Sequence, residues 1–104
     1  MNKCHFLGKL THPIELESDN GVPFCIFELE IEEFRKGRSN EGKVRDLTYL
    51  NFEAWDSAAS AIEKYAQEGK LIAIESVARN VQNEDNPEYL DTYFRVTSFK
   101  ILRS

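Results

Sequence analysis

Apolar and polar residues alternate through CIFELEIE, residues 25–32, and this pattern limits the possible folds more than any other stretch of the chain. Successive side chains of a β-strand point to opposite faces, so the alternation predicts a strand with one buried face. Cys25, Phe27, Leu29 and Ile31 share that face, with Ile26, Glu28, Glu30 and Glu32 on the other. The glutamates, continued by Glu33, are typical of a solvated face that blunts edge pairing, although a cation site is an alternative interpretation.

The alternation returns in residues 48–55, where Thr48, Leu50, Phe52 and Ala54 alternate with Tyr49, Asn51, Glu53 and Trp55. Further apolar segments predict strands over residues 3–10, 71–81 and 92–102, and the polar residues 82–87 predict a loop. The segment 18–21 contains an Asn-Gly pair, which favours a tight hairpin turn.

One amphipathic helix is predicted over residues 57–68, with a stripe formed by Ala58, Ala61, Ile62, Tyr65 and Ala66. Asp56 or Ser57 would supply its N-cap, and Gly69 stands where helices commonly end in a left-handed residue. The order is therefore three strands, one helix and two strands. It predicts an all-β fold, a five-stranded Greek-key OB-fold barrel with the helix between strands 3 and 4, in a single domain over residues 1–104.

The segment FRKGRSNEGKVRD, residues 34–46, concentrates positive charge in a chain whose net charge is −5. Five of the 13 Lys and Arg residues lie in the eleven positions 35–45, beside one carboxylate, Glu41, and they are Arg35, Lys36, Arg38, Lys43 and Arg45. The expected turn at 39–42 places this cluster on the arms and tip of a hairpin. A net-negative protein can still bind nucleic acid through such a localised positive surface. A solubilising loop is the alternative interpretation.

Tyr49 and Trp55 lie on the predicted outward face of the strand that the basic hairpin enters. Aromatic rings stack on nucleobases and nearby cations neutralise phosphates, so the combination indicates sequence-tolerant binding of a single strand. Each aromatic could instead pack under the helix or in a subunit interface. DNA and RNA both fit, because neither kind of contact reads the sugar 2′-hydroxyl.

No arrangement of residues is typical of catalysis, and we expect neither an enzyme nor a cofactor. His5 and His12 are the only histidines, and no glycine-rich phosphate loop precedes the helix. Cys4 and Cys25 lie in strand-like segments where a reduced, buried thiol is expected, and their spacing does not suggest a metal site. No apolar run approaches ~20 residues, and the first residues lack signal-peptide features, so we expect a cytoplasmic protein.

Segments along the whole chain resemble the bacterial single-stranded DNA-binding proteins. MNKCHFLGKLTHPIEL resembles the start of that family, FELEIEEF its second strand, and LTYLNFEAWDSAASAIEKYAQEGKLIAIE its third strand, helix and fourth strand. Each motif is loose, but their shared order is specific. The resemblance implies an OB-fold that binds single-stranded DNA in replication, recombination or repair, at the nucleoid. It also implies a homo-oligomer, with a tetramer favoured over a dimer.

The resemblance also assigns roles to individual residues. Tyr49 stands where the family has a base-stacking tryptophan, and Trp55 where it has a stacking phenylalanine. Phe34 lies at, or one residue before, another stacking tryptophan, and Arg79 matches a basic residue of the fourth strand.

Two positions depart from the family pattern. The last stacking tryptophan of the family falls near Asn83, so that platform is lost, and Tyr89 is its candidate replacement. Asn51 and Glu53 stand where basic or apolar residues are usual. A carboxylate on the binding face repels phosphate, so we expect weaker binding than is typical of the family.

Family members normally continue into a flexible Gly- and Pro-rich tail with an acidic tip that recruits replication and repair enzymes. Here Ser104 follows the last strand directly, which implies a trimmed domain or a tailless relative. An alternative function is an OB-fold adaptor of a replication-restart complex, similar to primosomal replication protein N, which acts through protein partners and binds DNA weakly. Glu53, the glutamate row and the missing tail favour the adaptor, whereas the basic hairpin favours the DNA-binding protein.

Overall fold

The computed structural model describes residues 1–38 and 42–102, which form six strands and one helix. In chain order these are β1 (Cys4–Leu10), β2 (Glu17–Asp19), β3 (Val22–Lys36), β4 (Lys43–Trp55), α1 (Ser57–Tyr65), β5 (Leu71–Gln82) and β6 (Leu90–Ile101). The predicted order of strands and helix is confirmed, with the short β2 added before the second predicted strand. The turn predicted at 39–42 falls mainly on residues 39–41, outside the described residues.

The strands close into a barrel because β1 pairs with a different strand along each edge. Most of β1 runs antiparallel to β5, while Lys9 and Leu10 pair with Glu30 and Leu29 of β3. The circuit continues from β5 through β6, β4 and β3, and β4 and β6 are parallel. Five strands of the described chain thus close the barrel, and β2 lies beside β3 at the margin of the sheet. This is the OB-fold arrangement expected from the sequence.

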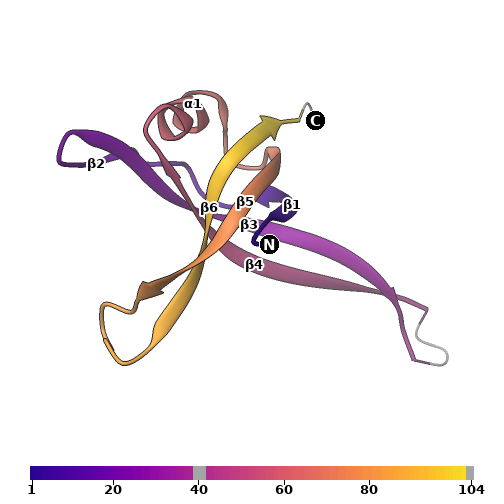
Figure 1. Cartoon of the computed structure of the whole chain (residues 1–104). Helices are drawn as coiled ribbons and strands as arrows, with labels where there is room; N and C mark the ends of the chain where they lie inside the picture. The colour runs from indigo at the N-terminus through magenta and orange to yellow at the C-terminus, as the bar shows by residue number, and fades with distance from the viewer. Residues whose placement is uncertain (39–41, 103–104) are drawn as a thin grey trace.

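A long antiparallel hairpin, made of β3 and β4, extends past the barrel. Its register runs without a shift from the Phe24–Trp55 pair to the Lys36–Lys43 pair. In Figure 1 the hairpin projects from the barrel toward the lower right, and the β5–β6 hairpin projects toward the lower left. We call the part of the β3–β4 hairpin beyond the barrel, residues 32–38 and 42–47, the arm.

The barrel interior is filled by the faces that the alternation predicts to be buried. Cys25, Phe27, Leu29, Phe52 and Ala54 are all buried. The Phe52 ring lies at the centre of an aromatic group, with its centroid 5.5 Å from that of Phe6 and 5.6 Å from those of Phe27 and Phe94.

The two cysteines are free thiols that differ in burial. Burial raises the pKa of the Cys25 thiol to about 11, so this cysteine is a packing residue that stays protonated at neutral pH. Cys4 is only partly buried, so the expectation of two buried thiols is wrong for this one.

Helix α1 packs against the barrel core, but its buried stripe is rotated from the predicted one. Ala59, Ile62 and Ala66 are buried, whereas Tyr65, predicted to be buried, is 60% exposed. The helix also ends at Tyr65 rather than near residue 68, because Ala66 adopts extended backbone angles. Within residues 1–38 and 42–102, no helix is long and apolar enough to cross a membrane.

The ends of α1 are held differently from the prediction. Asp56 is the N-cap residue with a φ of 57°, yet its side chain makes no capping hydrogen bond. Gly69 has the expected positive φ of 87°, but it belongs to a separate turn in which the Lys70 N–H donates to the Gln67 carbonyl at 3.0 Å. The Asn-Gly turn, by contrast, is confirmed: Asn20 and Gly21 have φ angles of 50° and 83° and join β2 to β3.

Gly8 lies where β1 crosses β3 and the barrel closes. A Cβ atom at this position would lie 2.9 Å from the Leu29 Cβ and 3.0 Å from the Glu30 carbonyl oxygen. The two backbones can approach this closely only because position 8 has no side chain.

We expect Gly8→Ala to lower the free energy of unfolding by roughly 1–3 kcal/mol, because the added methyl group forces β1 away from β3. Urea denaturation followed by circular dichroism measures this change. Lys9→Ala, at the exposed neighbouring position, is the matched control and should stay within about 0.5 kcal/mol of the wild type. A Gly8→Ala midpoint equal to that of the wild type would show that the closure tolerates a side chain.

Candidate functional site

The β3–β4 hairpin presents one continuous outward surface, because directly opposed residues on paired strands point to the same side. We call this surface the outer face; it carries the pairs Phe24–Trp55, Ile26–Glu53, Glu28–Asn51, Glu30–Tyr49, Glu32–Leu47, Phe34–Arg45 and Lys36–Lys43. The buried pairs Cys25–Ala54 and Phe27–Phe52 alternate with them. The outer face therefore joins the predicted aromatics to part of the predicted basic cluster.

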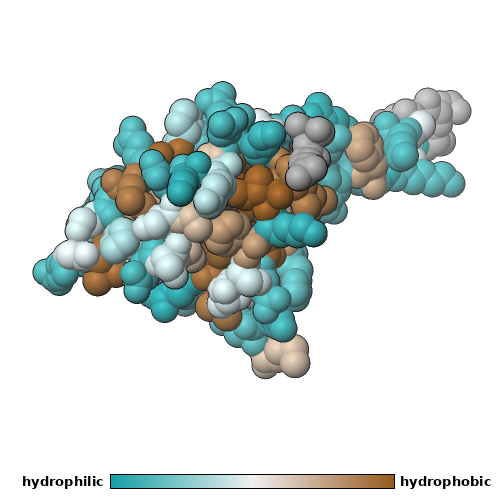
Figure 2. Space-filling model, turned by 90° about the horizontal axis from the view of Figure 1, so that it is seen from above, coloured by the Kyte–Doolittle hydropathy of each residue, from teal (hydrophilic) through white to brown (hydrophobic). Residues whose placement is uncertain are grey.

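On the arm, the outer face combines an exposed aromatic ring with cationic side chains. Phe34 is 55% exposed, and the Lys43 Nζ lies 5.2 Å from the centre of its ring. Lys36 lies opposite Lys43, Arg45 lies opposite Phe34, and Arg38 is exposed just beyond the end of β3. Figure 2 shows the arm at the right, with mainly hydrophilic side chains along it.

Arg35 does not belong to this surface, because adjacent residues of a strand point to opposite faces. Its Nε donates to Asp46 Oδ2 at 2.7 Å on the other side of the arm. Arg45 is also paired, at 2.9 Å from Glu32 Oε2, and this hydrogen bond raises the pKa of its guanidinium. The sequence places one carboxylate within the basic cluster, but strand pairing brings Glu32, Glu33 and Asp46 alongside it as well.

Tyr49 lies on the outer face at the base of the arm and is 51% exposed. Its hydroxyl donates to Glu30 Oε2 at 3.0 Å, and this hydrogen bond is the main cause that raises the pKa of Tyr49 above its ordinary value. The bond anchors the phenol across β3 and β4 while half of the residue stays open to a ligand. Part of the glutamate row is therefore engaged by neighbours rather than only solvated.

Trp55 lies at the other end of the outer face and stacks on Phe24. The two ring centroids are 4.8 Å apart, and the ring planes differ by 21°. The indole is partly exposed, and its Nε1 atom is buried with no hydrogen-bond partner among the described residues. Trp55 thus offers a ligand part of one ring, supported by a second aromatic ring.

Glu53, between Tyr49 and Trp55 on the same face, is buried beside two arginines. Its side chain is 5% exposed, Arg95 Nε donates to its Oε1 at 3.1 Å, and Arg79 is ion-paired with the same oxygen. We call these three residues the glutamate–arginine cluster. Glu53 is thus covered and paired rather than open to the ligand, and the cluster carries two positive charges against one negative. The weaker binding expected from this carboxylate stays a prediction.

A groove of about 290 Å³ opens beside this cluster, next to the β5–β6 loop. It is lined by Ile26, Glu53, Val81, Gln82, Asn83, Glu84, Asp85, Asp91 and Tyr93. Asn83 organises the loop: its Oδ1 accepts the N–H groups of Asp85 and Asn86, each at 2.9 Å, and its Nδ2 donates to Asp91. Tyr89 is 63% exposed in the same loop but does not line the groove.

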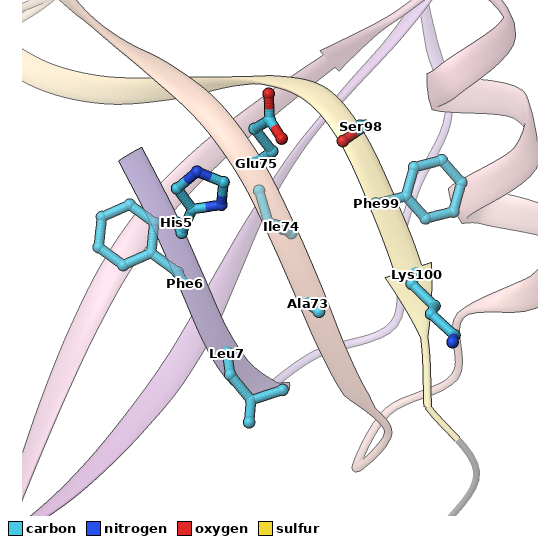
Figure 3. Close-up of a pocket in the computed structure, with 9 residues that line it drawn as sticks. All are labelled: His5, Phe6, Leu7, Ala73, Ile74, Glu75, Ser98, Phe99 and Lys100. Carbon is cyan, nitrogen blue, oxygen red and sulfur yellow. The ribbon is translucent and has the colours of Figure 1, made fainter. Parts of the chain in front are cut away.

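A larger hollow of about 490 Å³ lies outside β1, β5 and β6 (Figure 3). Its lining includes His5, Leu7, Glu75 and Lys100, and none of the predicted site residues. We therefore place the candidate site on the outer face, where the predicted residues meet.

Three residues of the site were not identified from the sequence: Phe24, Tyr93 and Arg95. Phe24 lies two residues before Ile26 and so points to the same outward side of β3; the alternation along the strand could have identified it. Arg95 reaches Glu53 only because β4 and β6 pair in parallel, which no local pattern indicates. In the described part of the chain, no three His, Cys, Asp or Glu side chains are grouped to hold a metal ion.

Residues 1–102 match the model of the single-strand binding protein family. Among curated proteins, no sequence shows significant similarity to the chain.

Solved structures with the same fold share little sequence identity with the chain. The Plasmodium falciparum SSB in complex with ssDNA has a TM-score of 0.85 at 16% identity, over 99% of this chain and 96% of that one. The small single-stranded DNA-binding protein from Streptomyces coelicolor has a TM-score of 0.77 at 10% identity, over 97% of this chain and 94% of that one.

The wild-type single-stranded DNA binding protein from Thermus aquaticus has a TM-score of 0.83 at 17% identity, and the match covers 99% of this chain. It covers 50% of the Thermus aquaticus chain, so this chain spans half the length of that protein. At such identities these likenesses establish the fold.

Proposed function

The chain belongs to the single-strand binding protein family, and we propose that it binds single-stranded DNA without catalysis and with little sequence preference, in replication, recombination or repair. The observation that carries the proposal is the composition of the outer face. Phe34, Tyr49 and Trp55 lie on one side of a single hairpin, each with part of its surface exposed, and cations lie on the arm and beside Glu53, between Tyr49 and Trp55.

On this proposal, a single strand follows the outer face from the arm toward the glutamate–arginine cluster. Its bases stack on Phe34, Tyr49 and Trp55, because base stacking on exposed rings tolerates any sequence. Tyr89, exposed on the β5–β6 loop, provides a further ring at the far end.

Phosphates along this path are neutralised mainly on the arm and beside Glu53. Lys36, Arg38 and Lys43 form no ion pair with any described residue, so they are the main phosphate contacts on the arm. Arg45 contributes less because Glu32 already holds it, and Arg35 contributes least because it faces the other side. Arg79 supplies positive charge beside Glu53, in the barrel part of the outer face.

Binding of oligo-dT should quench the fluorescence of Trp55, the only tryptophan, because a stacked base contacts the indole directly. Trp55→Ala should weaken binding by roughly 1–3 kcal/mol, measured by the anisotropy of a labelled oligonucleotide. Tyr65→Ala, which removes an exposed aromatic from the helix, is the control and should bind as the wild type does. Unchanged emission at saturating oligo-dT would refute the role of Trp55, and unfolding of Trp55→Ala would show that the residue is structural.

Replacing Lys36, Arg38 and Lys43 together by Gln should reduce the salt dependence of binding. For single strands, the slope of log K against log salt falls by about 0.7 for each phosphate that the protein no longer neutralises. The comparison variant is Arg35→Gln, whose charge is paired with Asp46, and its slope should change much less. Equal slopes for the wild type and the triple variant would mean that the arm does not follow the phosphate backbone.

We also propose that the protein is a homo-oligomer, with a tetramer favoured over a dimer. Apolar side chains on β1 and β5 support this proposal. Leu7, in the lining of the hollow in Figure 3, is 50% exposed, and Leu71, which lines a second, smaller hollow together with Leu7, is 36% exposed. A small barrel gains stability when such residues are covered by another copy.

Sedimentation equilibrium at micromolar concentration should therefore give a mass well above the 12.0 kDa of one chain. Leu7→Asp should shift the mass toward the monomer, because it places a charge in the proposed contact. Leu16→Asp, at an exposed leucine before β2, is the matched control and should leave the mass unchanged. A monomeric wild type would contradict the proposal.

A further inference from the structure

The glutamate–arginine cluster is built from three strands, β4, β5 and β6. Glu53 and Arg95 are paired across the parallel strands, and Arg79 reaches the same carboxylate from β5. The side chain of Glu53 is 5% exposed, while those of Arg79 and Arg95 are 38% and 45% exposed. The carboxylate is therefore covered, and the two guanidinium groups remain accessible to a ligand.

We propose, on the basis of the proposed function, that Glu53 is an internal competitor for phosphate, because it occupies the arginine pair that a phosphate of the bound strand would otherwise use. A carboxylate and a phosphate present the same kind of oxygen acceptor to a guanidinium group. A strand on the outer face would meet Arg79 and Arg95 with their charges already partly neutralised. Glu53 then sets the affinity and the salt dependence of this part of the interface.

The position of the cluster supports this role. Glu53 lines the groove that also contains Ile26 and Tyr93, so a strand whose base enters the groove brings a phosphate close to the arginines. Both arginines contact Glu53 Oε1 through Nε, Arg95 in a hydrogen bond and Arg79 in an ion pair. A phosphate can therefore engage either arginine fully only by exchanging with this carboxylate.

Binding of a phosphate to these arginines is opposed by two effects. A phosphate that takes over the arginines leaves a buried carboxylate with fewer partners, which opposes binding. Other carboxylates of the groove, Glu84, Asp85 and Asp91, also repel phosphate, but only through space. The inference is thus specific to Glu53, and Glu84 offers a control that removes the same charge from the same groove.

The test compares Glu53→Gln with Glu84→Gln in titrations of labelled oligo-dT at several salt concentrations. Glutamine keeps a carbonyl acceptor for the arginines but removes the competing charge. Glu53→Gln should bind at least about tenfold more tightly at low salt, since a freed guanidinium gains a charged hydrogen bond. Its salt slope should steepen by about 0.7 for each arginine released. Glu84→Gln should change affinity by less than about threefold, because its effect is screened.

Weaker binding by Glu53→Gln would overturn the inference, since it would show that Glu53 positions the arginines rather than occupying them. Equal gains for both variants would also overturn it, because bulk charge would then explain the effect. If the wild type binds and Glu53→Gln has the same affinity and slope, this inference fails alone. If neither protein binds oligo-dT, the proposed function fails and the inference falls with it.

A measurement on the wild type keeps the inference testable should Glu53→Gln not fold. The Nε–H resonances of Arg79 and Arg95 should both shift in NMR spectra as oligo-dT is added, because their acceptor changes from carboxylate to phosphate. Resonances that stay in place while binding saturates would overturn the inference. The Nε–H of Arg35, which is bonded to Asp46 on the opposite side of the arm, is the internal reference.

Discussion

The register of β3 against β4 is the constraint on which both the barrel and its outer face depend. Thirteen consecutive residue pairs follow one another without a bulge, from Phe24–Trp55 to Lys36–Lys43. A slip of β4 by one residue would exchange Phe52 for Glu53 in the interior and turn the outward rings of β4, Tyr49 and Trp55, inward. Phe52 opposes such a slip because it is fully buried among three other phenylalanines. The display of aromatics on the surface is thus a consequence of how the core is packed.

Charges on this hairpin are matched across strands rather than along the chain. Glu32 holds Arg45, Asp46 holds Arg35, and Glu53 holds two arginines from neighbouring strands. Exposed pairs of this kind add only about 0–1 kcal/mol each to stability. Their larger effect is on the charge of the surface, because paired charges cancel locally, whereas Lys36, Arg38 and Lys43 near the tip form no ion pair with a described residue. An acidic protein can in this way keep a surface that accepts anions.

The sequence predicted most of the fold because its strands alternate cleanly and one face of each is buried. The two strands of the hairpin, the Asn-Gly turn and the strand–helix order followed from local patterns. The stripe of α1 did not, because alanines occur on both sides of Ile62, at 58, 59 and 61, so apolar character alone does not decide which side faces the barrel. In the site, the outward positions of Tyr49 and Trp55 followed from the alternation along the strand, whereas Phe34 was assigned through the family resemblance. The burial of Glu53 could not be predicted, since its partners come from strands that are distant in the chain and meet it only through the closed topology.

Because β3 is longer than the barrel is deep, the β3–β4 hairpin has two parts that differ in how firmly they are held. Up to the Ile31–Thr48 pair the strands belong to the barrel. From Glu32–Leu47 to Lys36–Lys43 every residue is at least partly exposed, and the two strands are held by their ladder and by exposed cross-strand side-chain contacts, without a core. Amide hydrogens in a ribbon without a core exchange through local opening, at a free energy far below that of global unfolding. The arm can therefore change its twist and the spacing of its lysines while the barrel stays closed. A rigid barrel with a flexible arm can therefore adapt to single-stranded DNA, whose backbone has no fixed shape.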